Sequence, residues 1–306
     1  MIAERAAGAA GAGGAAGGGA PGHSRGGPTV VRVMLGGQLR RLREARGMSR
    51  EEAGQAIRVS RSEIGRVELG HVRVGRREVS ELLTLYGIDD ERERASVLDL
   101  VRQGGVPGWW HQYGDVLPDW FETYVGLEEA ADTIRTYEVQ FVPGLLQHED
   151  YARAVALLMF AQEPTENVDR RVALRMARQR LLTRPDGPQL QCVVDEAALR
   201  RPLGGRRVLR AQLEHLIEVC ALPNVTLQIV PFDADIPMAV GCPFTILRFA
   251  EPALPDVVYL EQLTSALYLD APADVADYTH IMGNLKKAAH PPSDTRSILH
   301  NFLAEL

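Results

Sequence analysis

The sequence predicts an α+β protein, in which an all-α N-terminal domain of five helices is followed by a larger domain of mixed α/β structure. Between residues 34 and 104, apolar residues recur at helical spacing and glycines separate the segments. Beyond residue 126, short runs rich in β-branched and aromatic residues alternate with helical patterns. A chain of 306 residues, 45% of them hydrophobic, is long enough for two domains.

Residues 1–33 are predicted to form a disordered tail. Ten glycines and nine alanines occur within residues 1–28, so almost no side chain can bury apolar area and offset the entropy of ordering. The tail lacks the apolar stretch of a secretory signal. Because patterned sequence begins only near Val30 to Met34, we also expect translation to start there.

Charge is distributed unevenly along the chain. Residues 30–78 hold 12 arginines and 6 glutamates, a net charge of +6, whereas the whole chain carries −6. This pattern indicates that only the N-terminal part contacts a polyanion. Of the 34 basic residues 32 are arginine, so codon usage contributes to the excess and the charge alone does not indicate nucleic-acid binding.

Composition excludes several classes of protein. Cys192, Cys220 and Cys242 lie too far apart to suggest a zinc site or a redox pair, which favours a reducing compartment and predicts a cytoplasmic protein. No apolar run approaches the roughly 20 residues that cross a bilayer, so no membrane partner is expected. We expect no metal site and no cofactor.

Residues 34–104 are predicted to contain a helix-turn-helix. Ser49 and Glu52 have the spacing of a capping box, and Ser60 and Glu63 repeat it eleven residues later. Two capped helices separated by a turn of three or four residues define this motif. Helices marked by Leu35 to Ala45, Val79 to Tyr86 and Ala95 to Val101 complete the set of five.

The helix that follows the second cap is the predicted recognition helix. At 100° per residue, its outer face is free for DNA when Ile64 and Val67 point to the core. Arginine can contact guanine or phosphate, serine serves either, and free amides at helix N-termini favour phosphate. The predicted DNA-binding residues are Arg50, Ser60, Arg61, Ser62, Gly65 and Arg66. The alternative is a small helical domain whose arginines only solvate its surface.

Residues 105–125 are predicted to form an aromatic-rich linker. The segment holds Trp109, Trp110, Tyr113, Trp120, Phe121 and Tyr124. We interpret these side chains as a hydrophobic seam between the domains, with a ligand-stacking site as the alternative.

Residues 126–306 are predicted to form a mixed α/β domain that serves regulation or partner binding. The expected strands are Leu190–Val194, Val225–Val230, Phe244–Phe249 and Val257–Leu260. Helices are expected from Tyr151 to Leu158, from Val168 to Arg184, and near residues 206–220 and 271–289. The arginine-rich helix among them is interpreted as a solvated face. The sequence does not predict the order of the strands.

The segment that begins at Pro143 is the most distinctive part of this second domain. We consider two interpretations, a turn that fixes the first helix of a packed core and a pocket or partner surface. For the second, the candidate residues are Gln147, Asp150, Tyr151 and Arg153. No catalytic residue is predicted, because Asp195 and Glu196 precede a helix and are interpreted as its cap. His215 has no second metal ligand at helical spacing.

Residues 35–87 resemble the Xre, or Cro/CI-like, helix-turn-helix domain. The resemblance is carried by Leu39-Arg40-Arg41-Leu42-Arg43, Met48-Ser49-Arg50-Glu51-Glu52-Ala53, Ile57-Arg58-Val59-Ser60 and Ile64-Gly65-Arg66-Val67-Glu68-Leu69-Gly70. It implies five helices and binding of double-stranded DNA as a homodimer. Two residues depart from the family pattern: Arg58 replaces the glycine that has a left-handed conformation in the turn, and Gly65 replaces a small polar residue.

The second part of the chain, from about Trp120 to Leu303, resembles the C-terminal domain of actinobacterial antitoxin-like regulators. The similar segments are Val142-Pro143-Gly144-Leu145-Leu146-Gln147, Asp150-Tyr151-Ala152-Arg153, Arg178-Gln179-Arg180-Leu181-Leu182 and Leu227-Gln228-Ile229-Val230-Pro231. This resemblance implies a small protein partner encoded nearby. The prediction is a non-enzymatic, sequence-specific transcriptional regulator. The alternative is an antitoxin-like module that sequesters a small protein and regulates its own synthesis.

Overall fold

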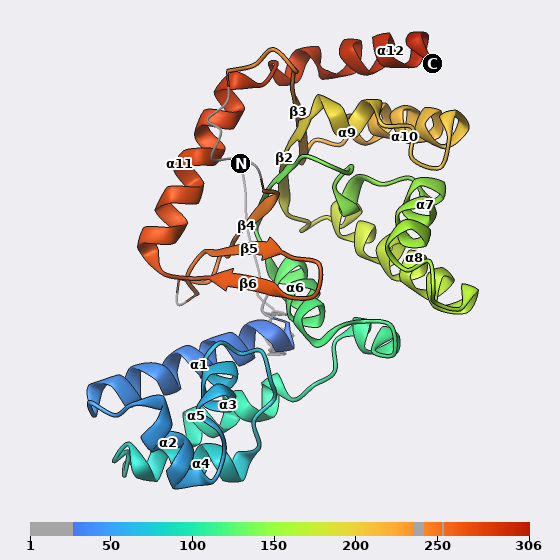
Figure 1. Cartoon of the computed structure of the whole chain (residues 1–306). Coiled ribbons are helices and arrows are strands. Elements are labelled where there is room, and N and C mark those ends of the chain that lie inside the picture. The colour runs from blue at the N-terminus through green and yellow to red at the C-terminus, as the bar shows by residue number, and fades with distance from the viewer. Residues whose placement is uncertain (1–26, 236–241, 253) are drawn as a thin grey trace, which may run out of the picture.

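The structure is a computed structural model that describes residues 27–235, 242–252 and 254–306 (Figure 1). It confirms the predicted fold class, because a helical N-terminal region precedes a mixed α/β domain with a six-stranded sheet. In Figure 1 the helical domain lies below this sheet. Residues 1–26 of the predicted tail lie outside the described residues.

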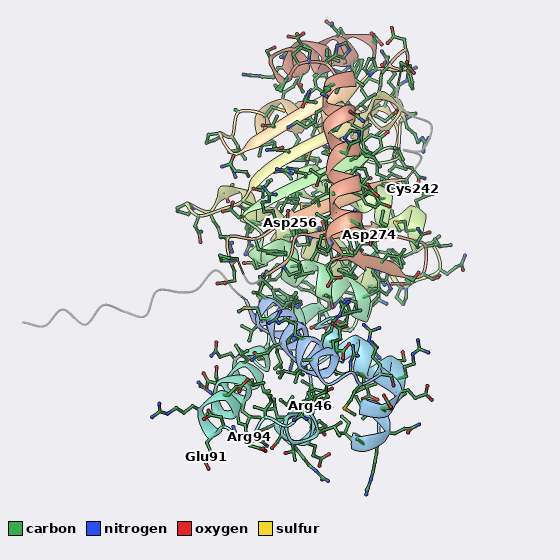
Figure 2. The ribbon with its side chains drawn as sticks, turned by 90° about the vertical axis from the view of Figure 1, so that its left-hand side faces the viewer. Arg46, Glu91, Arg94, Cys242, Asp256 and Asp274 are labelled. Atoms are coloured by element: carbon green, nitrogen blue, oxygen red, sulfur yellow. The ribbon has the colours of Figure 1, made fainter. Side chains whose placement is uncertain are left out.

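All five predicted helices of the N-terminal domain are present. They are α1 (Pro28–Ala45), α2 (Arg50–Ile57), α3 (Arg61–Glu68), α4 (Arg76–Leu85) and α5 (Glu91–Gly104). Their apolar faces share one core that includes Leu39, Ala53, Ile64, Leu83 and Val97. At its edge Arg94, labelled in Figure 2, joins α5 to α4 by donating to the Ser80 hydroxyl at 2.9 Å.

The first helix corrects the predicted tail. α1 begins at Pro28, so residues 28–33 are helical and not part of a disordered tail. Proline is tolerated in the first turn because the helix leaves that N–H unpaired. Val30 is 2% exposed and packs with Ala130 and Leu254 of the second domain. Tertiary burial therefore stabilises as a helix a segment that local patterning had assigned to the disordered tail.

The aromatic-rich segment is folded, and the boundary expected between residues 125 and 126 falls inside a helix. The segment contains the 3₁₀ helix η1 (Trp109–Tyr113) and most of α6 (Asp119–Ala130). Trp110 is 1% exposed and packs with Val125 and with Leu174 of a later helix. A Cβ on Gly126 would lie 2.0 Å from the Thr29 hydroxyl oxygen, so this glycine lets α1 approach α6. These contacts support the interpretation of a packed seam.

Six strands form one sheet in the order β3-β2-β1-β4-β5-β6. Their bounds are β1 (Thr133–Glu138), β2 (Gln189–Asp195), β3 (Val225–Val230), β4 (Phe244–Arg248), β5 (Val257–Glu261) and β6 (Ala266–Leu269). β1, β2 and β3 are parallel, whereas β4, β5 and β6 each run antiparallel to the preceding neighbour. The four predicted strands are confirmed, and β1 and β6 were not predicted. β1 reads Thr-Ile-Arg-Thr-Tyr-Glu, which lacks the apolar run typical of a central strand.

Helices cover both faces of the sheet. They are α6, α7 (Glu149–Met159), α8 (Thr165–Gln179), α9 (Glu196–Arg200), α10 (Arg206–Val219), α11 (Pro272–Ala288) and α12 (Thr295–Glu305), with the 3₁₀ turns η2 (Gly144–Leu146), η3 (Arg180–Thr183) and η5 (Pro292–Asp294). On one face, Met282 and Leu285 of α11 pack on strand residues such as Val258. Figure 2 shows α11 crossing the strands of the sheet. The opposite face packs on α6, α7, α9, α10 and α12.

No helix within the described ranges is long and apolar enough to span a bilayer.

Candidate nucleic-acid interface

Both predicted helix caps form, although only one is reciprocal. The Ser49 N–H donates to Glu52 Oε2 at 2.7 Å, and the Glu52 N–H donates back to Ser49 Oγ at 3.2 Å. At the second cap the Glu63 N–H donates to Ser60 Oγ at 3.0 Å. These bonds define where α2 and α3 begin, and they present the N-terminal turns of both helices to solvent.

Two residues allow the chain to turn between α2 and α3. One, Arg58, has a left-handed backbone, and the other, Gly54, lets the turn pass close to α2. Arg58 has φ +62° and ψ +38°, the left-handed conformation that the family pattern assigns to glycine there. Among the described residues it is the single non-glycine with a positive φ. Gly54 matters equally and was not singled out by the sequence: a Cβ there would lie 2.7 Å from the Val59 carbonyl oxygen. Its signal was a glycine one turn before the end of a short helix.

The orientation of α3 agrees with the prediction. Ile64 is 1% exposed and Val67 is 8% exposed, so both point to the core. On the other side of the helix, four of the predicted DNA-binding residues are exposed, and these are Ser60, Arg61, Ser62 and Arg66. Gly65 is half-buried beside them. The exposed side of α3 therefore offers guanidinium and hydroxyl donors of the kind that contact bases and phosphates.

Arg50 is held in place by a buried carboxylate. Its Nε donates to Glu68 Oε2 at 2.8 Å, and the Glu68 side chain is only 1% exposed. Arg43 donates to the same carboxylate through Nε at 2.5 Å and Nη2 at 3.0 Å. Glu68 thus fixes α1, α2 and α3 relative to one another, a role that sequence reasoning missed. The one sign of this role in the sequence is that Glu68 directly follows Val67, which helical spacing places toward the core.

The contact with Glu68 leaves part of Arg50 available. The side chain is 36% exposed. A Cβ on Gly65 would lie 3.9 Å from Arg50 Nη1, so the missing side chain at residue 65 keeps the space beside this guanidinium open. Arg50 therefore lies beside Gly65 in the second turn of α3, and the capped N-terminus of this helix at Ser60 is exposed. Together they can bind one phosphate group through a guanidinium and backbone amides.

Two family models match the chain. Residues 34–96 match a helix-turn-helix domain, and residues 121–301 match a domain of unknown function, DUF5753. The second match covers more than half of the chain. The chain belongs to the DUF5753 family. The helix-turn-helix match supports a DNA-binding regulator. No curated protein and no solved structure matches the chain.

The candidate partner residues of the DUF5753 domain do not lie together on its surface. Gln147 is 3% exposed; its Nε2 donates to the Val142 carbonyl at 2.6 Å and its Oε1 accepts from Arg175 Nη1 at 2.7 Å. Tyr151 is completely buried, and its hydroxyl accepts from the Val142 N–H at 3.4 Å. These contacts support the interpretation of a turn that fixes α7. Asp150 and Arg153 are partly exposed, and Arg153 pairs with Asp169.

The arginines of α8 do not form the solvated face that was expected. Arg178 donates to both oxygens of Glu128 at 2.7 Å, and this pair is buried. Arg171 donates to Glu163 Oε1 at 2.8 Å. Arg170 donates to Asp115 Oδ2 at 2.7 Å, on the segment between η1 and α6. The expectation failed because two of the three partner carboxylates, Glu128 and Asp115, lie 50 and 55 positions away in sequence.

A charged cluster lies at the carboxyl ends of β1 and β5, where Glu138 and Arg175 are half-buried and Glu261 is exposed. Burial and the charge of Glu261 raise the pKa of the Glu138 carboxyl to about 8. Burial and the charge of Arg178 lower the pKa of Arg175 to about 10. The Tyr259 hydroxyl donates to Glu261 Oε2 at 3.0 Å. The sequence did not predict this cluster, because Glu138 ends a strand that was itself not predicted.

Two other polar residues of the DUF5753 domain, Asp195 and His215, make contacts that stabilise the fold. Asp195 Oδ1 accepts from the Ala197 N–H at 2.8 Å, so Asp195 caps α9 as predicted. The ring of His215 packs edge-on against His148, and their centroids are 5.9 Å apart. In the described part of the chain no group of three or more His, Cys, Asp or Glu side chains could hold a metal ion.

Proposed function

We propose that this protein is a sequence-specific transcriptional regulator of the Xre type, which binds operator DNA as a homodimer in the cytoplasm and has no enzymatic activity. The observation that carries the proposal is the exposed side of α3, where Arg61 and Ser62 follow the capped N-terminus at Ser60 and Arg66 lies in the last turn. The match to a helix-turn-helix family supports the same function.

In this proposal some residues of the motif position it on the DNA backbone, and others contact bases or phosphates. Arg50 and the amides that follow Ser60 bind the phosphate backbone and set the position of α3. Arg61 and Arg66 provide guanidinium groups for bases or phosphates, and Ser62 provides a hydroxyl. Gly65 makes no side-chain contact and allows close approach of the backbone to DNA.

Fluorescence anisotropy of the full chain tests this function. We expect tighter binding to the DNA upstream of its own gene than to a scrambled duplex, and we expect the preference to persist at physiological salt. Arg66→Ala is expected to weaken specific binding by about 1 to 3 kcal/mol if Arg66 contacts a base. An equal loss on both duplexes would assign Arg66 to phosphate. No binding at low salt would contradict the proposal.

An antitoxin-like function is the second candidate, and one surface favours it. Leu157, Leu158 and Met159 at the end of α7 are 51%, 58% and 45% exposed. These three apolar residues, consecutive at the C-terminal end of α7, leave apolar surface exposed to solvent, which favours a partner there. We would express the chain with the small protein encoded nearby and purify it by size exclusion. Co-elution that is lost in Leu158→Asp supports this function, and separate elution of the wild type contradicts it.

A further inference from the structure

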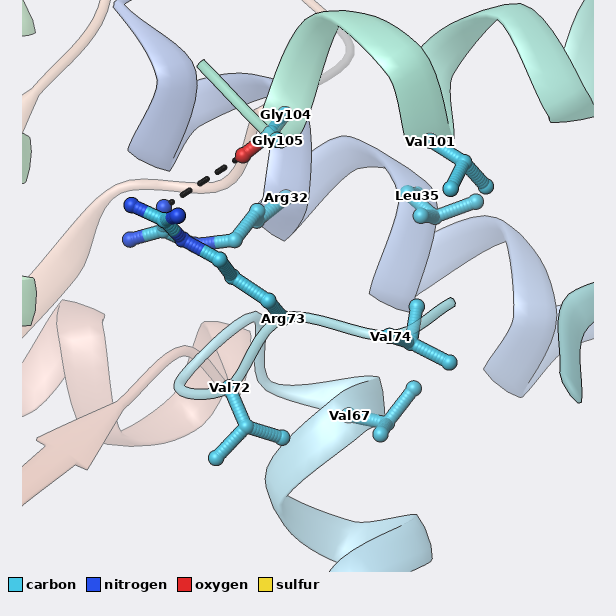
Figure 3. A pocket seen from close by; sticks show the side chains of 9 residues that line it. All are labelled: Arg32, Leu35, Val67, Val72, Arg73, Val74, Val101, Gly104 and Gly105. Carbon is cyan, nitrogen blue, oxygen red and sulfur yellow. Dashed lines mark hydrogen bonds between the residues drawn. The ribbon is translucent and has the colours of Figure 1, made fainter. Parts of the chain in front are cut away.

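A cavity of about 540 Å³ lies between the helix-turn-helix domain and the DUF5753 domain. One wall comes from α1 and the end of α3, and the other from β5, β6, the start of α11 and α6. The volume lies within the range of roughly 300 to 1,000 Å³ that is usual for small-molecule sites. By comparison, the pocket in Figure 3 measures about 20 Å³, space for about one water molecule. It lies where Arg32 donates to the Gly104 carbonyl.

The walls of the larger cavity are mostly apolar. The apolar side chains come from both domains and include Met34, Leu69, Val257 and Pro272. The ring of His71 packs against that of Tyr268 at an angle of 58°, with centroids 4.7 Å apart. Burial lowers the pKa of His71 to about 4, so its ring is neutral at pH 7. The Tyr268 hydroxyl donates to the Trp120 carbonyl at 2.5 Å, which fixes this wall.

Most charged groups around the cavity already have partners. Glu68 is bound by Arg43 and Arg50, as described above. Arg40 Nε donates to Glu44 at 3.1 Å, and its Nη1 lies 3.9 Å from Asp270. Arg41 lines the same cavity, and within the described ranges it makes no hydrogen bond or ion pair. An apolar space with one unpaired cation at its edge fits a ligand with an apolar body and one negative charge.

We propose that this interdomain cavity binds a small amphipathic anion, with its apolar body against Met34 and Val257 and its anionic group on Arg41. We further infer that occupancy changes the affinity for DNA, an inference that rests on the proposed function. The ligand would contact α1 and α3 on one side and the sheet on the other. It would therefore bind best to one relative orientation of the two domains, and linkage requires that DNA and ligand then affect one another.

The probe for the binding test is 8-anilinonaphthalene-1-sulfonate, an aromatic anion whose fluorescence rises when it leaves water. We expect saturable fluorescence with the full chain, displacement by decanoate, and no displacement by decyltrimethylammonium at the same concentration. Arg41→Ala should weaken decanoate binding at least tenfold. Arg77→Ala, which removes an exposed arginine of α4 that does not line the cavity, should leave it unchanged.

A variant that fills the cavity shows where the probe binds. Gly37 of α1 lines the cavity, so Gly37→Trp should abolish the fluorescence. Gly283→Trp is the matched control, because Gly283 is also a helical glycine with open space at its Cβ and lies on α11 away from the cavity. Equal fluorescence in the wild type and in folded Gly37→Trp would overturn the proposed site. So would displacement by the cationic surfactant as readily as by decanoate.

The coupling is tested on DNA. Saturating decanoate should change the dissociation constant for the preferred duplex at least threefold in the wild type and in Gly283→Trp, and not in Gly37→Trp. An unchanged dissociation constant in the wild type would overturn the coupling while the cavity remains a binding site. If the chain binds no DNA, the proposed function fails, and the fluorescence results still decide the cavity.

Discussion

Helices α3 and α8 are both rich in arginine, yet the structure uses their arginines in opposite ways. On α3, Arg61 is exposed next to the capped N-terminus. On α8, Arg171 and Arg178 form ion pairs with Glu163 and Glu128. The difference comes from the carboxylates that the fold brings near each helix. A count of basic residues therefore does not distinguish a nucleic-acid surface from an internal ion-pair network.

The largest expected effect concerns the buried pair on α8. Arg178→Met leaves the Glu128 carboxylate, 2% exposed, without its partner, and a stranded buried charge costs about 3 to 5 kcal/mol of unfolding free energy. Urea denaturation followed by circular dichroism measures the loss. Arg180→Ala, at the exposed first residue of η3, is the control and should change stability by less than about 0.5 kcal/mol. A similar loss in both variants would contradict the comparison.

The double variant Arg178→Met with Glu128→Leu should recover most of this stability, because it removes both charges. Failure to recover would mean that the guanidinium acts chiefly through its contacts with the rings of Phe121 and Tyr124.

The next largest effect is a dependence of the stability of the chain on pH, caused by Glu138 in the charged cluster with Arg175 and Glu261. The pKa of Glu138 is raised from 4.5 to about 8, so the folded state binds more protons than the unfolded state between these values. Stability from this group is complete below pH 4.5 and is lost as pH rises through 8. Glu138→Gln should therefore stabilise the chain at pH 9, by about 2 kcal/mol once the full shift of roughly 5 kcal/mol is reduced for solvent screening of this half-buried group, with little change at pH 4.5. Thermal denaturation at both pH values, with exposed Glu166→Gln as control, checks this prediction.

A smaller effect compares the two helices directly on DNA. Arg61→Ala should weaken binding by about 1 to 2 kcal/mol, since it removes an exposed guanidinium from the proposed interface. Arg170→Ala removes an arginine that is paired with Asp115 and should leave DNA affinity unchanged. Anisotropy titrations of both variants decide this. Equal losses would place α8 in the DNA interface and contradict the proposed distinction.

The smallest expected effect lies in the turn before α3. A non-glycine residue in the left-handed region is strained by roughly 1 kcal/mol, so Arg58→Gly should stabilise the chain by up to about 1 kcal/mol. The same change at Arg76, which lies in the first turn of α4 with a helical backbone, should not stabilise it. Urea denaturation distinguishes the two. A loss of stability in Arg58→Gly would show that the Arg58 side chain makes a compensating contact.

Features set by neighbouring residues were predictable from the sequence. The capping box at Ser49 and the inward positions of Ile64 and Val67 depend on spacings within one or two turns of helix. The left-handed turn at Arg58 followed from the family pattern and is confirmed. The predicted DNA contacts remain predictions, because their exposure is compatible with that role and does not test it.

Features that depend on distant residues were not predictable. The strand β1 lies at the centre of the sheet, yet its polar residues Arg135 and Glu138 break the apolar pattern of a buried strand. The ion pair of Arg178 joins residues 50 positions apart. The cavity brings Arg41 of α1 near Val257 of β5. Each of these features depends on how distant segments pack together. The periodicity of residues within one segment does not report that packing.

Helix α1 belongs to two hydrophobic cores at once. Val30 packs against the DUF5753 domain, whereas Leu39 lies in the core of the helix-turn-helix domain. When either core unfolds, one end of α1 loses its packing contacts. The rest of the helix is then less stable, and the packing of its other end in the second core weakens. The two domains should therefore melt in a single cooperative transition, with one calorimetric peak in place of two, even though the chain reads as two separate modules.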